Sequence, residues 1–192
     1  MTGEKLDRRI RRTRRMLKQG LAELMREKDF QNITVKDITE RCDFNRCTFY
    51  LHYTDTYDLL EKLENDTLHD FQAMINANHS QRNSSSLQPA ITSVIDYLIE
   101  NADICKVLFE NKASSEFVKK FQDLICLNGA VIIREWLPNA TDETLNYCFS
   151  YITSGMIGMV RHWFDTGMAL ERQEIIDRIE RLIKASAMAL LT

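Results

Sequence analysis

The chain has 192 residues, of which 44% are apolar and 28% charged, and its formal net charge is −3. That apolar content can fill the core of one compact domain or two small ones, which argues against a disordered chain. No apolar run approaches the roughly 18 residues of a membrane span, and the first residues lack a signal-peptide core, so we expect a cytoplasmic protein without membrane contact. Six glycines, two prolines and no sustained apolar-polar alternation predict an all-α fold.

The first predicted helix runs from about residue 6 to 28 and is basic at its start. Eight Lys or Arg side chains and two acidic ones lie within residues 1–18. Residues 1–53 hold 13 basic and 8 acidic side chains, which leaves 12 and 20 for the rest of the chain. The near-neutral total therefore conceals a basic end that attracts nucleic acid, although a solvated helix face is the alternative explanation of such a run.

A short helix is expected next. Thr34 stands three residues before Asp37, the spacing of a capping box, so this helix should begin at Val35. Ile38 and Cys42 lie one turn apart and should face the core.

A turn and a second short helix follow. Residues 43–45, Asp-Phe-Asn, suit a turn, because Asp tolerates a left-handed backbone and Asn45 can cap the next helix. That helix should run over 46–52 with Phe49 pointing inward and polar or aromatic side chains outward. Residues 33–53 therefore have the layout of a helix-turn-helix that binds DNA.

The rest of the chain predicts six further helices, which gives nine in all. A polar stretch over residues 78–86 is the one linker-like segment, and Pro138 and Gly167 are expected breaks. The expected helices cover about residues 55–78, 89–101, 103–110, 115–137, 141–166 and 171–190.

Candidates for catalysis or metal binding are weak. The five cysteines are widely and irregularly spaced, and no phosphate-binding glycine loop is present. Cys47 is either a small filler residue or a position where oxidation disturbs DNA contact. An enzyme using His52, His69, His79 or His162 as a base is the weakest hypothesis, since none lies beside a plausible nucleophile. We therefore expect no enzyme, no metal and no cofactor.

The last two predicted helices carry apolar and small residues at three-and-four spacing. One partner helix could not cover these stripes, so we expect them to pair with a second copy as a four-helix bundle about a two-fold axis. The candidate dimer residues are Ile152, Gly155, Met159, Trp163, Ile175, Ile179, Leu182, Ile183 and Ser186.

Three segments carry a family resemblance. They are Thr-Arg at 13–14, Thr-Val-Lys-Asp-Ile at 34–38 and Thr-Phe-Tyr-Leu-His-Tyr at 48–53. Together they resemble the TetR family of transcriptional regulators over about the first 60 residues, and residues 53–60 are similar to a subset from Gram-positive bacteria. The resemblance implies a helix-turn-helix domain over 6–66 and an effector-binding and dimerisation domain over 67–192. It also implies a homodimer that represses from a palindromic operator and is released by an unidentified small molecule.

The resemblance also assigns roles to the residues of the motif. Phosphate contacts are expected from Thr34, Tyr50, His52 and Tyr53, and base contacts from Lys36, Asn45, Arg46 and Thr48. Arg46 is the first candidate for specificity, because arginine binds guanine bidentately in the major groove.

Three positions depart from the family pattern. The family usually has Gly at the position of Asp43 and often has Gly at the position of Cys47. It often has Lys at the position of Thr56. These departures motivate an alternative hypothesis, a helical ligand-sensing co-regulator whose DNA-binding half is weakened or used for protein contacts. That alternative predicts weak DNA binding with little dependence on salt.

An effector cavity could be lined by Met and aromatic side chains, which adapt to apolar ligands, although such stripes are more often plain core. The candidate residues are Phe71, Met74, Phe109, Phe117, Phe121, Tyr147, Tyr151 and Met156.

Overall fold

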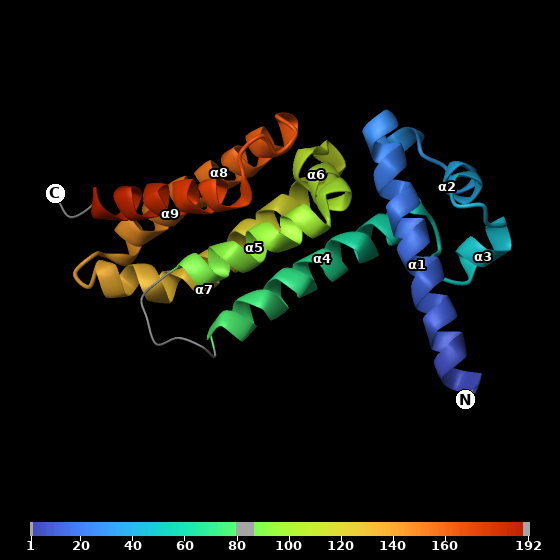
Figure 1. The fold of residues 1–192 in the computed structure, drawn as a ribbon, viewed down its shortest axis with the longest axis horizontal. Coiled ribbons are helices and arrows are strands. Elements are labelled where there is room, and N and C mark those ends of the chain that lie inside the picture. The colour runs from blue at the N-terminus through green and yellow to red at the C-terminus, as the bar shows by residue number, and fades with distance from the viewer. Residues whose placement is uncertain (1, 80–86, 190–192) are drawn as a thin grey trace. The chain divides into compact units, whose positions relative to one another are not determined.

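The computed structural model describes residues 2–79 and 87–189, with side chains for 7–77, 87–130 and 133–189. The described residues form nine α-helices and two short 3₁₀ helices without a strand, so the all-α prediction is confirmed (Figure 1). The helices are α1 (Thr2–Glu27), α2 (Val35–Arg41), α3 (Arg46–Tyr50), α4 (Thr56–His79), α5 (Gln88–Glu100), α6 (Ala102–Glu110), α7 (Ser115–Trp136), α8 (Asp142–Asp165) and α9 (Arg172–Met188). The 3₁₀ helices are Phe30–Asn32 and Lys112–Ser114.

Most helix ends lie within one or two residues of their expected positions. The first helix begins earlier, at Thr2 instead of about residue 6. The α3 helix ends at Tyr50 instead of His52, because the amide of His52 bonds the carbonyl of Phe49 at 2.9 Å in a tighter turn. Residues 80–86 of the expected linker lie outside the described part of the chain.

The chain forms two units. The first comprises Met1–Thr67 and Asp103–Ser114, and the second comprises Leu68–Ala102 and Ser115–Thr192. The α4 helix therefore contributes its first half to one unit and its second half to the other. A boundary near residue 67 was expected, but α6 was expected in the second domain and the structure groups it with the first unit.

The first unit is built around the buried faces of α1, α2, α3 and the start of α4. Leu17, Leu21, Ile38, Phe49 and Leu59 have no exposed surface. Each comes from the apolar face of its own helix, so burial of these stripes supplies the main stabilisation of the unit.

Polar contacts attach α6 to α1 in the same unit. The Arg26 guanidinium donates to the carboxylate of Asp103 at 2.6 Å, and the Gln19 amide donates to the same carboxylate at 3.5 Å. Gln19 and Arg26 lie two turns apart on one face of α1. Together they hold the first turn of α6 against α1.

The second unit is a helical bundle in which α9 packs against α5, α7 and α8, and α7 packs against α8 (Figure 1). Its core includes Ile95, Leu98, Phe117 and Ile176, each at most 1% exposed. At its surface, Arg172 of α9 donates to the Asp96 carboxylate of α5, with Nη2 to Oδ2 at 2.7 Å, and this contact lowers the pKa of Asp96.

Candidate nucleic-acid interface

The start of α2 is fixed by the expected capping box. The amide of Asp37 donates to the hydroxyl oxygen of Thr34 at 3.2 Å, and the amide of Thr34 donates to the Asp37 carboxylate at 2.8 Å. The Thr34 hydroxyl donates to the same carboxylate at 2.7 Å, and Lys28 forms an ion pair with it at 2.9 Å. These contacts, led by Lys28, lower the pKa of Asp37 to about 2. The Thr34 hydroxyl is thus engaged in the cap.

The turn between α2 and α3 is made by Asp43 in the left-handed region, with φ of 55°. The amide of Phe44 then bonds the carbonyl of Thr39 at 2.9 Å and closes the turn over the end of α2. The glycine that is usual here in the family adopts this conformation without steric cost. Asp43 adopts it at a cost in conformational energy and adds an exposed carboxylate. The expected turn is therefore present, on a residue that is unusual there.

The start of α3 is capped by Asn45. Its side-chain oxygen accepts the amide of Thr48 at 2.7 Å and the hydroxyl of Thr48 at 3.0 Å. Asn45 is exposed and Thr48 is half-buried. The two expected base-contacting residues are thus held by each other.

The outward face of α3 is open. Phe49 is fully buried, as expected, while Tyr50 is 57% and Leu51 79% exposed. Arg46 and Cys47 are also exposed, and Cys47 is a free thiol. On α2 the exposed Lys36 lies 3.7 Å from Glu40, an ion pair loose enough to leave the ammonium accessible. The side chains of Lys36, Asn45, Arg46 and Tyr50 are thus all exposed, and we call this set the readout face.

Tyr53 does not belong to this face, which corrects the expectation of an outward tyrosine. It is 3% exposed, and its hydroxyl has no hydrogen-bond partner among the described residues. Burial raises the pKa of Tyr53 to about 12. The ring packs beside Phe49, at 5.7 Å between centroids, and under the ammonium of Lys62 at 5.3 Å. The side chain is core because the chain turns inward where α3 ends.

The neighbouring His52 is half-buried. Burial lowers the pKa of His52, and the positive charge of Arg14 lowers it further. The charge of Arg14 also acts on Tyr53, which places the basic part of α1 near the end of α3. The basic run and the helix-turn-helix therefore share one region of the first unit.

The arginines in the first half of α1 are exposed. Thr13 is 9% exposed and Leu17 is buried, so their side of α1 faces the core and the arginines lie on its other sides. The exposed ones include Arg11, Arg12, Arg14 and Arg15. Arg11 forms an ion pair with Asp7 at 2.7 Å, and both groups are more than half exposed, so the pair restrains the arginine little.

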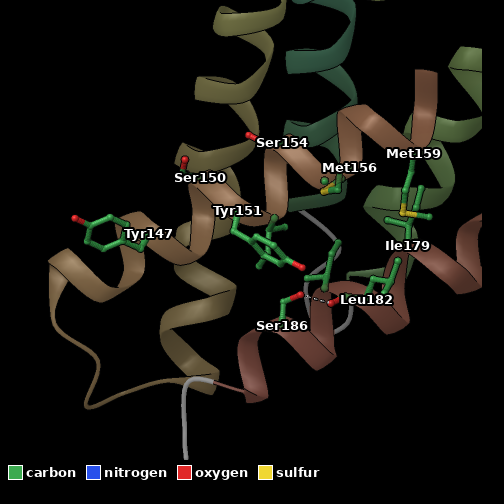
Figure 2. Close-up of a pocket in the computed structure, with 12 residues that line it drawn as sticks. Tyr147, Ser150, Tyr151, Ser154, Met156, Met159, Ile179, Leu182 and Ser186 are labelled. Carbon is green, nitrogen blue, oxygen red and sulfur yellow. Dashed lines mark hydrogen bonds between the residues drawn. The ribbon is translucent and has the colours of Figure 1, made fainter. Parts of the chain in front are cut away.

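A second candidate surface lies between α8 and α9. An open groove of about 580 Å³ is lined from α8 by Tyr147, Tyr151 and Met159, and from α9 by Leu182 and Ser186, among others (Figure 2). Tyr147 is 72%, Tyr151 71% and Leu182 54% exposed. Gly155 of α8 is exposed, and a Cβ atom at this position would have no neighbouring atom within 4 Å. This apolar surface has no cover within the described chain.

The candidate dimer residues divide between this groove and the core. Seven of the nine line it: Ile152, Gly155, Met159, Ile179, Leu182, Ile183 and Ser186. Trp163 and Ile175 are 2% and 1% exposed and are absent from the lining, and the Trp163 indole donates to the carbonyl of Leu170 at 3.0 Å. Trp163 and Ile175 were expected at the dimer interface, but their side chains are buried in the second unit. The apolar stripes of α8 and α9 are wide enough to contribute both to the groove and to the core.

Four of the candidate effector-pocket residues, Phe71, Phe109, Phe117 and Phe121, are buried. Phe71 and Phe121 pack with ring centroids 4.7 Å apart, and Phe117 stacks on Phe121 at 6.3 Å, inside the second unit. Met74 is half-buried on α4. Phe109 is buried on α6, within the first unit.

Three further pocket candidates, Tyr147, Tyr151 and Met156, line the α8–α9 groove instead. The positions 147, 151, 154, 155 and 159 repeat at three and four residues, so sequence spacing could have placed them on one exposed helical face. Because Tyr147 and Tyr151 are aromatic, they were assigned to a ligand cavity, and their spacing along one exposed helical face was overlooked.

Neither a metal-binding cluster nor a membrane-spanning helix occurs among the described residues. No cluster of His, Cys, Asp or Glu there could hold a metal ion. No helix among them is long and apolar enough to cross a membrane.

Comparison with known proteins decides the family. A model described as the C-terminal region of transcriptional regulators matches residues 85–185, and one described as bacterial regulatory proteins of the tetR family matches residues 19–63. The chain belongs to the TetR family. TetR-family proteins are DNA-binding transcription factors without enzymatic activity.

Individual relatives agree with this assignment. The chain is 38% identical over 61 residues to YxbF of Bacillus subtilis (strain 168), described as an uncharacterized HTH-type transcriptional regulator, a match that covers 31% of this chain. It spans only 16% of the length of that relative.

Solved structures show the same fold over nearly the whole chain. A TetR transcriptional regulator from Streptococcus agalactiae 2603V has a TM-score of 0.64 at 19% identity, over 94% of this chain and 98% of that one. The fatty acid degradation regulator FadR from Bacillus halodurans has a TM-score of 0.72 at 11% identity, over 89% and 94%. The TetR-like fold therefore includes both units.

Proposed function

We propose that this TetR-family regulator binds a palindromic operator as a homodimer and represses transcription until a small molecule releases it. The observation that carries the DNA part is the readout face, where α3 holds its apolar Phe49 inside and leaves Arg46 and Tyr50 exposed. Basic α1 side chains near the end of α3 supply attraction to phosphates. Lys36, Asn45, Arg46 and Thr48 are the proposed base contacts, and Tyr50 and His52 the proposed phosphate contacts.

Thr34 is proposed to act mainly through structure. Its hydroxyl both donates and accepts within the cap of α2, so its role is to position Lys36. Tyr53 is proposed as a core residue and is withdrawn from the DNA-binding set because it is buried.

The homodimer proposal rests on the α8–α9 groove. Its exposed tyrosines and Leu182 form an apolar surface that water contacts unfavourably, and two helices from each subunit would cover it as a four-helix bundle. In the proposed homodimer the two copies of α3 would bind adjacent major grooves about 34 Å apart.

The effector is proposed to bind in the second unit, where Phe71, Phe117 and Phe121 give an apolar interior. An effector releases the operator when it binds more tightly to the conformation whose recognition helices no longer match the two grooves. One related fold, the FadR repressor of Thermus thermophilus, was solved with lauroyl-CoA. Lauroyl-CoA is therefore a useful first probe within a wider panel of apolar metabolites.

Selection of bound fragments from random duplexes tests the function. A two-fold symmetric consensus is expected, with affinity falling roughly 10³-fold or more between 50 and 200 mM salt if about six phosphates are contacted. A reporter driven by the selected operator should be silenced by the protein and restored by an active effector.

The co-regulator alternative keeps one observation in its favour. Thr56, which stands where the family often has a phosphate-binding lysine, is 9% exposed and adds no charge. Weak binding without a consensus and with a flat salt dependence would support this alternative and contradict the operator-binding proposal.

A further inference from the structure

The capping bonds of α3 limit how Asn45 can meet a base. A carboxamide has an oxygen that accepts and a nitrogen that donates. The oxygen must be the atom that faces Thr48, because the backbone amide of Thr48 can only donate, at 2.7 Å. The Thr48 hydroxyl lies 3.0 Å from the same oxygen and must also donate to it. Both lone pairs of the Asn45 oxygen are therefore occupied.

The nitrogen of Asn45 makes neither of these bonds, and the residue is exposed on the readout face. Asparagine usually reads adenine with both of its atoms, accepting from N6 and donating to N7. That pairing needs the oxygen, which the cap already uses. Guanine presents two acceptors, N7 and O6, and no donor on the same edge.

Resting on the proposed DNA-binding function, we propose that Asn45 is a specificity-determining residue that acts as a donor only and favours guanine over adenine in each half-site. Thr48 has the opposite polarity, since its hydroxyl proton is given to Asn45 and only its lone pairs and methyl group remain for DNA. The cap thus sets which edge each side chain can recognise.

Three proteins test the proposal: the wild type, Asn45→Ser and Asn45→Asp. Asparagine, serine and aspartate all cap helices well, so the unfolding midpoints should agree. Serine replaces the carboxamide with a shorter side chain that still has one O–H donor, and aspartate replaces the donor nitrogen with an acceptor oxygen. Bound duplexes are selected from a random pool with each protein, and the preferred bases are compared at each half-site position. Arg46→Ala, selected in parallel, identifies the position read by its neighbour.

The wild type is expected to prefer guanine by at least about fivefold at one position that Arg46→Ala leaves unchanged. Asn45→Asp should shift the preference toward cytosine, whose N4 donates. Asn45→Ser, with a donor on a shorter side chain, should weaken the preference for guanine without reversing it. An adenine at the Asn45-dependent position, or the same consensus from all three proteins, would overturn the inference and leave the operator-binding function intact. Failure of the wild type to select any consensus would instead overturn the proposed function, and the inference with it.

Discussion

The Sγ of Cys42 occupies the space in which a side chain on Gly20 would begin. The thiol also donates to the carbonyl of Met16 at 3.1 Å, so it is held between α1 and the end of α2. The next atom near that space, Cγ of Arg41, is 3.6 Å away, at ordinary contact distance. Close packing of α1 against the helix-turn-helix therefore depends on one small residue and one thiol.

We expect Gly20→Ala to destabilise the protein by about 1–3 kcal/mol, because overpacking outweighs the better helix propensity of alanine. Denaturant unfolding would measure the change. In a Cys42→Ala background the same substitution should be neutral or stabilising, since the obstructing sulfur is gone. Equal losses in both backgrounds would show that the clash is not the cause.

Tyr53→Phe is expected to leave DNA binding unchanged and to raise the free energy of unfolding by about 1 kcal/mol or more, because it removes a buried hydroxyl without a partner. Urea titration and operator affinity are the two measurements. A loss of affinity as large as that from Tyr50→Phe would return Tyr53 to the DNA-contacting set.

The same substitution has a consequence at alkaline pH. The pKa of Tyr53 is raised from 10.0 to about 12 in the folded protein. The folded state thus holds this proton more tightly than the unfolded state. The resulting contribution to the free energy of unfolding is present below pH 10 and lost as the pH rises toward 12. Tyr53→Phe should therefore lose less stability over that interval than the wild type.

Removal of the α2 cap should weaken both stability and DNA binding. Thr34→Ala is expected to cost about 0.5–2 kcal/mol, whereas Thr34→Ser retains the hydroxyl and should cost less. The folded-state pKa of Asp37 is about 2, below its ordinary 3.8. Its stabilisation is thus full above about pH 4 and lost as the pH falls toward 2. Asp37→Asn should show a shallower loss of stability across that range, measured by thermal unfolding.

Arg46→Ala and Tyr50→Phe should separate base contact from phosphate contact. The arginine substitution should lower affinity for the selected operator by about 1–3 kcal/mol and change affinity for random DNA little. The tyrosine substitution should weaken both to a similar extent, because a phosphate contact carries no sequence information. Fluorescence anisotropy with the two duplexes at fixed salt would decide; equal losses from both substitutions would reject the base-contact assignment.

Leu182→Glu tests the dimer face. Leu182 is 54% exposed in the subunit, so the charge can be solvated in a monomer but not in a covered interface. Sedimentation should show monomers and operator affinity should fall. Leu127→Glu, 76% exposed on α7, is the matched control and should remain dimeric. Ile179 is unsuitable because it is 2% exposed, and a charge there would unfold the subunit.

The sequence predicted the elements better than the sites. Thr34, Asn45 and Thr141 cap helices as local spacing indicated, because a cap depends on residues three positions apart. The burial of Tyr53 depends on how the chain turns after α3. The division of the dimer candidates between groove and core depends on how α8 and α9 pack. Such tertiary contacts leave no periodic signal in the chain.

The membership of α6 in the first unit has a practical meaning for anyone who cuts or recombines this protein. The polypeptide crosses from one unit to the other within α4, again before Asp103, and again after Ser114. A fragment that ends at residue 67 would lack the Asp103 carboxylate that pairs with Arg26. A hybrid in which everything beyond residue 67 is exchanged would pack the α6 of another protein against the native α1. A hybrid that exchanges the second unit should therefore keep residues 103–114 together with the rest of the first unit.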